Sequence, residues 1–364
     1  RDPELIPTII DAIENAKCID NIVFGICLQD TESVLKTFPY QNSENFRIHK
    51  VLYTESKGVC WARRLIQTEL LKKEKYYLQI DSHMRFVKDW DKKLMDQLNL
   101  CESKKPIISV YPGAYSPYDE NKMHKNNNTI YRLSSEKFYK SVGDNKYSLY
   151  IIGKQVKDIY KTPQKSYYCS GNFLFTLSKW ANECPYSNNI YFRGEEDYIM
   201  FESYKNNWDV FYTQIPIIYH FYVRKKEKKV FEYDKEWMRK NKIGEEVLKK
   251  YIETEDIIKD FEKELGIDYK NFKISKNLYT GYFSKKILYD KFKFKIKRYH
   301  YEGGYFEKRY NKVWIEFKDD EVKEFKAFKQ LSKNKDEFIL FNYNEKCYIK
   351  INNNKIDLGF RNKN

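Results

Sequence analysis

The chain has 364 residues, of which 41 % are hydrophobic and 17 % aromatic, a composition that excludes a mainly disordered or collagen-like polypeptide. This length accommodates one large domain and a small one, with a sizeable buried core. The net charge at pH 7 is +15 and comes mostly from residues 225–364. This basic region either forms a surface that binds an anionic glycan, a membrane or nucleic acid, or its charge only reflects a composition rich in Lys and Asn.

The cysteines and the hydrophobic pattern both favour a cytoplasmic protein. Seven Cys stand singly without a Cys-x-x-Cys pair, which fits neither a disulfide framework nor a zinc ribbon. The sequence contains no run of about 18 apolar residues that would span a bilayer. Its first residues also lack the charged-then-apolar pattern of a signal peptide. We therefore expect reduced thiols and no transmembrane segment.

The first part of the chain alternates between helical and strand patterns. Apolar residues recur at helical spacing between Leu5 and Asn15, and the apolar run at 21–28 indicates a buried strand. The alternation continues with predicted strands at 48–53, 76–80 and 106–111 and predicted helices at 58–72 and 90–98. Such alternation predicts a mostly parallel α/β sheet covered by helices.

The later part of the chain divides into three regions. Residues 116–166 lose the periodicity and predict a long excursion, after which strands are predicted at 167–177, 209–213 and 217–221 and a helix near 195–204. We expect a catalytic domain over residues 1–224, with a helical extension over 225–272. Short alternating runs separated by Gly and Asn predict a small antiparallel β module over 273–364.

Asp81 and His83 follow directly on the predicted strand at 76–80. Ligands bind at the carboxyl ends of strands in open α/β sheets, and residues i and i+2 of an extended segment point the same way. A carboxylate and a neutral imidazole suit Mn²⁺ or a similar divalent ion, which can stabilise a diphosphate as leaving group. The competing interpretation is a loop Asp that caps a turn beside an incidental His.

Two segments that contain glycine are candidates for contact with a phosphorylated ligand. Gly58 opens the predicted helix that carries Arg63, and a helix N-terminus with an Arg in its first turns can bind phosphate. The alternative is a surface Arg on an amphipathic helix. Gly171 interrupts a predicted apolar strand, which indicates either close approach of the backbone to a ligand or a simple bulge.

Charged side chains mark two further segments. Glu195, Glu196 and Asp197 open a predicted helix, where acidic residues ordinarily complement the helix dipole. His220 lies at the end of the apolar strand at 217–221 and is followed by Arg224. It is either a further ligand at the same site or a hydrogen-bonded core histidine.

Taken in order, these segments resemble the cytoplasmic-type glycosyltransferase (GlcNAc) family, whose best-known members attach N-acetylglucosamine to hydroxyproline. The similarity covers roughly residues 1–270. It is carried by Arg-Asp-Pro-Glu at 1–4, Gly-Val-Cys-Trp-Ala-Arg at 58–63, Leu-Gln-Ile-Asp-Ser-His-Met-Arg-Phe at 78–86, Gly-Glu-Glu at 194–196, Tyr-His-Phe-Tyr-Val-Arg at 219–224 and Gly-Ile-Asp-Tyr at 266–269. The catalytic half of polypeptide N-acetylgalactosaminyltransferases is similar more distantly.

The resemblance implies a GT-A fold, which is a Rossmann-like domain of nucleotide-diphospho-sugar transferases. It also implies that the domain binds Mn²⁺ and a UDP-sugar, which in this family is UDP-GlcNAc. Carried over by position, the metal ligands would be Asp81, His83 and His220. The donor contacts would be Arg63 for the UDP portion, Gly171 and Glu195 for the sugar and Arg224 for the diphosphate, with Glu196 near the acceptor. The family reaction retains anomeric configuration, so Glu195 or Glu196 would orient the acceptor hydroxyl of a protein or glycan.

Two features depart from the family pattern. A first strand that usually helps to hold the uridine precedes the Arg-Asp-x-Glu segment in the family and is absent from this chain, and residues 273–364 match nothing in the family. The competing function is a non-catalytic GT-A-fold protein that binds an anionic glycan or nucleic acid through its basic C-terminal region, where Lys and aromatic residues alternate at 291–299. Alternating Lys also protects edge strands. We therefore expect no nucleic-acid partner; the oligomeric state is left open.

Overall fold

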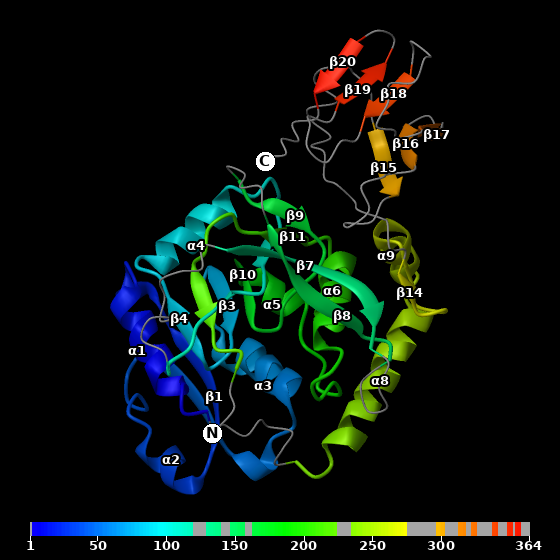
Figure 1. The fold of residues 1–364 in the computed structure, drawn as a ribbon. Helices are drawn as coiled ribbons and strands as arrows, with labels where there is room; N and C mark the ends of the chain where they lie inside the picture. Colours follow the sequence, from blue (N-terminus) through cyan, green and yellow to red (C-terminus); the bar gives the residue numbers. More distant parts are fainter. Residues whose placement is uncertain are drawn as a thin grey trace. The chain divides into compact units, whose positions relative to one another are not determined.

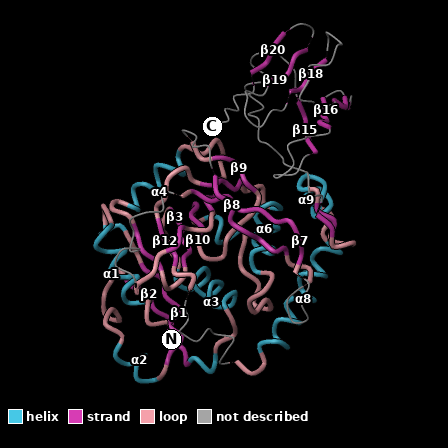
Figure 2. The backbone as a smooth tube through the Cα atoms, viewed as in Figure 1, coloured by secondary structure: helices cyan, strands magenta, loops and turns pink. Residues whose placement is uncertain are grey.

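The computed structural model describes residues 2–118, 129–139, 146–156, 162–223 and 234–274, and six strands between residues 296 and 357. The chain forms two compact units, residues 1–258 and 259–364. In the first unit the strands gather at the centre, with helices such as α1 (Leu5–Asn15) and α4 (Trp90–Asn99) at the periphery (Figures 1 and 2). The predicted α/β class with a C-terminal antiparallel β module is confirmed.

The largest sheet has five strands in the order β3-β10-β5-β11-β9. Their bounds are β3 Tyr76–Ile80, β10 Phe173–Leu177, β5 Pro106–Ser109, β11 Asp209–Tyr212 and β9 Gln164–Ser166. The prediction of a mostly parallel sheet is wrong: β10 runs antiparallel to both β3 and β5, and β9 runs antiparallel to β11. A buried strand gives the same apolar run in either direction, so the hydrophobic pattern could not reveal this.

Two smaller sheets accompany the five-stranded sheet in the first unit. Parallel strands β1 (Phe24–Asp30) and β2 (Phe46–Leu52) form one of them. In the other, β12 (Ile218–His220) lies between β4 (Met84–Phe86) and β6 (Gly113–Ala114). Because the register of β12 and β4 sets His220 opposite Met84, it brings His220 next to the segment that carries His83.

Three segments differ from their predicted secondary structure. The strand predicted at 167–177 begins only at Phe173, as β10. The region predicted as an excursion contains a hairpin of β7 (Ile130–Phe138) and β8 (Leu149–Val156), whereas residues 119–128 lie outside the described part. Polar residues along both strands hide the period-2 pattern that would have revealed them. The helix predicted at 58–72 is α3 (Val59–Leu65) followed by a π-helical turn at Ile66–Leu70.

The remaining elements are further helices and turns, and the strands of a β-rich C-terminal region. The helices are α2 Glu32–Thr37, α5 Lys179–Glu183, α6 Glu195–Lys205, α8 Trp237–Thr254 and α9 Ile257–Leu265, with 3₁₀ turns at Ile19–Asn21 and Tyr53–Glu55. The C-terminal strands are β13 Ile267–Asp268, β14 Lys273–Ile274, β15 Ile296–Glu302, β16 Lys312–Phe317, β17 Val322–Phe325, β18 Glu337–Leu340, β19 Tyr348–Ile351 and β20 Asn354–Asp357. Strands β15–β17 and β18–β20 form two antiparallel sheets of three strands each.

The core of the first unit packs helices onto the five-stranded sheet. Leu94 and Leu98 of α4 share one hydrophobic cluster with Phe173 and Phe175 of β10. The six cysteines within the described residues are all free thiols, in keeping with the expectation from their spacing. Among the described helices, none is both long enough and apolar enough to cross a bilayer.

Gly58 fixes the start of α3 in a conformation that other residues rarely adopt. Its φ is +100°, and a Cβ at this position would lie 2.3 Å from the carbonyl oxygen of Tyr191. We expect Gly58→Ala to lower the free energy of unfolding by about 1–3 kcal/mol, the usual cost of such a strained backbone. The urea concentration at the midpoint of unfolding measures this loss of stability. Gly153→Ala is the control, because its Cβ would meet the nearest atoms at 3.4 Å or more, and equal loss in both variants would contradict the prediction.

Candidate functional site

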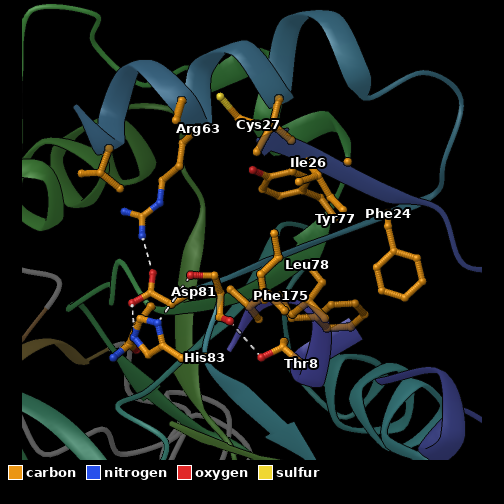
Figure 3. Close-up of a pocket in the computed structure, with 18 of the residues that line it drawn as sticks. Thr8, Phe24, Ile26, Cys27, Arg63, Tyr77, Leu78, Asp81, His83 and Phe175 are labelled. Carbon is orange, nitrogen blue, oxygen red and sulfur yellow. Dashed lines mark hydrogen bonds and ion pairs between the residues drawn. The ribbon is translucent and has the colours of Figure 1, made fainter. Parts of the chain in front are cut away.

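One large cavity of about 1280 Å³ lies in the first unit. Figure 3 shows two kinds of lining. Apolar side chains such as Phe24, Ile26 and Leu78 lie at one end. The ionic side chains of Arg63 and Asp81 lie with the imidazole of His83 at the other, which we call the charged end. The charged end lies just past the carboxyl end of β3, where ligands bind in α/β sheets.

Three side chains converge at the charged end of the cavity. One ligand atom from each of Asp81, His83 and His220 lies within 4.8 Å of the others. His220 Nε2 is 3.2 Å from Asp81 Oδ2, and His83 Nε2 is 3.7 Å from the same oxygen. Both imidazoles are buried, with His83 4 % and His220 6 % exposed. A carboxylate and two imidazoles at these distances can hold one divalent cation.

Asp2 determines which nitrogen of His83 faces the cluster. The Asp2 carboxylate lies 2.8 Å from His83 Nδ1 and also accepts hydrogen bonds from Ser82 Oγ and the Glu4 amide. Although burial raises it, the pKa of Asp2 is lowered overall by the hydrogen bond and charge of His83. His83 Nε2 is buried and makes no hydrogen bond to any residue that the structure describes. A proton on Nδ1 therefore leaves the Nε2 lone pair directed at the cluster, as a metal ligand requires.

Arg63 links the cluster to the first turn of α6. Its side chain is 6 % exposed, and it donates hydrogen bonds to Asp81 Oδ1 at 3.1 Å and to Glu195 Oε2. Burial alone would raise the pKa of Asp81, but the hydrogen bond with His220 and the charge of Arg63 lower it. Burial raises the pKa of Glu195, while Arg63 opposes that rise. Asp81 is therefore ionised at neutral pH and available as a ligand.

A hydrogen bond connects Gly171 to Glu196, which follows Glu195 in the first turn of α6. The Gly171 amide and the Tyr111 hydroxyl donate hydrogen bonds to the two oxygens of the Glu196 carboxylate, each at 2.9 Å. Burial and the charge of Glu195 raise the pKa of Glu196 to about 7. A Cβ at Gly171 would lie 2.3 Å from Glu195 Oε1, so only glycine allows the backbone to approach α6 this closely.

Asp197 is the third acidic residue of the first turn of α6. It is 2 % exposed and accepts a hydrogen bond from the Leu149 amide at 3.0 Å. Burial and the nearby charge of Glu196 raise its pKa to about 8. Asp197 therefore ties α6 to the start of β8.

The structure brings together most of the residues predicted from the sequence. Those that lie around the charged end of the cavity or against it are Arg63, Asp81, His83, Gly171, Glu195, Glu196 and His220. Arg224, predicted near the diphosphate, lies outside the described residues. Asp2 and Tyr111 were not predicted to be site residues. Asp2 was in the Arg-Asp-Pro-Glu segment of the family resemblance, but no local pattern pointed to Tyr111.

Comparisons with known proteins give a family match and a structural similarity. A model of the family described as glycosyltransferase (GlcNAc) matches residues 33–280, more than half of the chain. Solved structures similar to the chain include a crystal structure of GalNAc-T7 with UDP, GalNAc and Mn²⁺. The identity is 12 % and the TM-score 0.49, over 95 % of this chain and 74 % of that chain. No curated protein matches the chain.

We predict that Asp2→Asn weakens Mn²⁺ binding about 10- to 100-fold, the usual effect of removing a carboxylate that orients a metal-binding histidine. An amide can donate to His83 Nδ1 and so stabilise the tautomer whose Nε2 carries the proton. Isothermal titration with Mn²⁺ measures the change without reference to turnover. Ser82→Ala removes another partner of Asp2 but leaves the carboxylate on His83, so it should bind Mn²⁺ normally. Unchanged affinity in Asp2→Asn would contradict this role.

We also predict that Asp197→Asn stabilises the protein at pH 8 but not at pH 4. The unfolded chain loses the Asp197 proton near pH 4, whereas the folded chain keeps it up to a pKa of about 8. The free energy of unfolding therefore falls as the pH rises between these two values. The fall exceeds about 1 kcal/mol, because each unit of pKa difference between the folded and the unfolded chain corresponds to about 1.4 kcal/mol. Melting temperatures at both pH values measure the difference. The exposed Asp20→Asn is the control, and a pH-independent gain in Asp197→Asn would argue against the linkage.

Proposed function

From the premise that this chain belongs to the glycosyltransferase (GlcNAc) family, we propose that it transfers N-acetylglucosamine from UDP-GlcNAc to a hydroxyl group of a protein or glycan. We propose further that the reaction depends on Mn²⁺ or a similar divalent cation and retains the configuration of the sugar. The fold that goes with this proposal is GT-A.

The observation that carries the proposal is the convergence of Asp81, His83 and His220 next to a buried Arg63 in one large cavity. A nucleoside diphosphate is anionic, and a site for its departure needs positive charge directed at the phosphates. A structural histidine pair would instead be expected to satisfy its ring nitrogens within the core. The buried Nε2 of His83, which has no hydrogen-bond partner within the described part of the chain, favours the metal-binding interpretation.

The residues of this chain would hold and orient the donor. Asp81, His83 and His220 would hold the cation, which when bound neutralises charge on the departing diphosphate. Arg63 lines the same cavity and would contribute a second positive charge to the UDP portion. Arg63 is itself held in place by Asp81 and Glu195, so the cation site and the donor contact share one charge network.

Two carboxylates would define the sugar and the acceptor positions. We assign Glu195, which lines the cavity, and Gly171, whose backbone lies directly against Glu195, to the donor sugar, as the family resemblance implies. We assign Glu196 to the acceptor hydroxyl. With a pKa raised to about 7, Glu196 can accept a hydrogen bond or a proton from that hydroxyl near neutral pH. Acceptor attack on the face from which the diphosphate leaves would retain the configuration.

The competing proposal of a nucleic-acid or glycan-binding scaffold receives less support. It depends on alternating Lys and aromatic residues at 291–299, of which only 296–299 are described, within β15. Strand β15 lies at the edge of its sheet, where alternating Lys serves to prevent unwanted pairing. This structural explanation needs no partner.

The decisive experiment is hydrolysis of UDP-GlcNAc, UDP-GalNAc, UDP-glucose and UDP-galactose with and without Mn²⁺. We expect turnover of UDP-GlcNAc that requires Mn²⁺. Asp81→Ala and His83→Ala should each reduce this turnover by at least about 100-fold, because a metal contributes several kcal/mol and each 1.4 kcal/mol is tenfold in rate. His49→Ala is the matched control, since His49 lies on β2 and outside the cavity lining.

The outcomes separate the parts of the proposal. Metal-dependent turnover of a different UDP-sugar would overturn the choice of GlcNAc but keep the site. Turnover that persists in Asp81→Ala and His83→Ala would overturn the metal ligands. If no UDP-sugar is bound or hydrolysed in the presence of Mn²⁺, the catalytic proposal fails.

A further inference from the structure

A second buried arginine lies two residues after His83 and forms a compact polar group of its own. Arg85 of β4 is 8 % exposed and donates hydrogen bonds from Nη2 to Glu4 Oε2 at 2.7 Å and from Nη1 to Tyr115 Oη at 2.9 Å. The Tyr115 hydroxyl in turn donates to Glu4 Oε2 at 3.1 Å. We call Arg85, Glu4 and Tyr115 the Arg85 triad. None of its three residues lines the large cavity.

The contact between Glu4 and Arg85 sets the register in which Asp2 faces His83. The Asp2 carboxylate lies 2.8 Å from His83 Nδ1. Glu4 and Arg85 each lie two residues further along the chain, so the same two segments are joined by a second contact at the same spacing. The Glu4 amide also donates a hydrogen bond to Asp2 Oδ1 at 3.0 Å. Together these contacts leave Asp2 little freedom to move along the imidazole.

Tyr115 connects the Arg85 triad to the strand that carries the third proposed metal ligand. It directly follows β6, and its amide donates a hydrogen bond to the carbonyl oxygen of His220 at 3.1 Å. Its ring lies 5.8 Å from the ring of Phe221, the next residue along that segment. Tyr115 therefore joins the backbone at His220 to the ion pair of Arg85 and Glu4.

The ion pair of the triad can hold these segments firmly because it is buried. The side chains of Arg85 and Glu4 are 10 % and 14 % exposed, and a buried pair is strongly destabilised when one partner is removed. A guanidinium also fixes direction, since its donors form a rigid planar fork, whereas an ammonium group is a point charge. Metal ligands must lie within roughly 0.2 Å of their preferred distances. A directional contact of this kind therefore matters more for binding a cation than for folding.

We propose that Arg85 is a positioning residue of the metal cluster. Through Glu4 it keeps the Asp2 carboxylate on the imidazole of His83, and through Tyr115 it keeps β12 in place. It acts through these neighbours, because it lies outside the lining of the cavity. The inference rests on the proposed function, since it concerns the same cation.

The first test is metal binding by Arg85→Lys, which keeps the positive charge but loses the planar fork. We expect the dissociation constant for Mn²⁺, measured by isothermal titration, to rise about tenfold, as for other residues that orient metal ligands from outside the first shell. The visible absorption of bound Co²⁺, which depends on its coordination geometry, should also change. Tyr115→Phe keeps the ring and the amide but loses the hydroxyl, and should weaken Mn²⁺ binding by less.

Arg47→Lys is the matched control. Arg47 of β2 likewise donates one hydrogen bond to a carbonyl oxygen, that of Leu70, and one to a carboxylate, that of Glu74. It belongs to a different sheet from β4 and β12. We expect Arg47→Lys to lower the melting temperature as Arg85→Lys does, but to leave the affinity for Mn²⁺ unchanged. An equal loss of affinity in the two variants would show general destabilisation and overturn the proposal.

A double-mutant cycle tests the route through Asp2. If Arg85 acts by holding Asp2, its replacement matters little once the Asp2 carboxylate is gone. Arg85→Lys should then weaken Mn²⁺ binding by about threefold or less in an Asp2→Asn background, because residues that act through one contact are not additive. A full tenfold loss in that background would show that the two residues act independently, contrary to the proposal.

The results separate this inference from the proposed function. If the parent chain binds Mn²⁺ and Arg85→Lys binds it with the same affinity and the same Co²⁺ spectrum, the positioning role is wrong and the metal site stands. If the parent chain binds neither metal, the metal site itself is wrong and the positioning role fails with it.

Discussion

The buried guanidinium of Arg63 is the charge around which the site is built. It is 6 % exposed and hydrogen-bonded to both Asp81 and Glu195. A buried cation without compensation would cost several kcal/mol, so the two carboxylates must stay close to it for the fold to be stable. They belong to different elements, the segment after β3 and the first turn of α6. The same ion pairs therefore stabilise the domain and place the polar groups of the site.

The first turn of α6 shows why three consecutive acids need not be simple partners of the helix dipole. Each points in a different direction, because successive residues are rotated by about 100° around a helix. Glu195 meets Arg63, Glu196 accepts hydrogen bonds from the Gly171 amide and Tyr111, and Asp197 accepts one from the Leu149 amide. One helical turn thus distributes buried negative charge to three neighbouring segments. Its stability depends on all three.

The parts of this structure that could be predicted from sequence are those set by local pattern. Strand β3 has the predicted bounds, because an apolar run ends abruptly at the polar residues Asp81 to His83. The direction of β10 and the hairpin of β7 and β8 could not be predicted, since strand direction leaves no mark in the hydrophobic pattern and polar residues interrupt the hairpin strands. The contact of Asp2 with His83 joins residues far apart in sequence, and only the fold reveals it.

The contact of Asp2 with His83 has a practical consequence for interpreting variants of the protein. The two residues are 81 positions apart in the sequence, yet the carboxylate of Asp2 contacts a histidine of the proposed metal cluster. A substitution that displaces the segment around Asp2 would release the imidazole that Asp2 orients. Loss of metal in such a variant would then not show that a metal ligand had been changed.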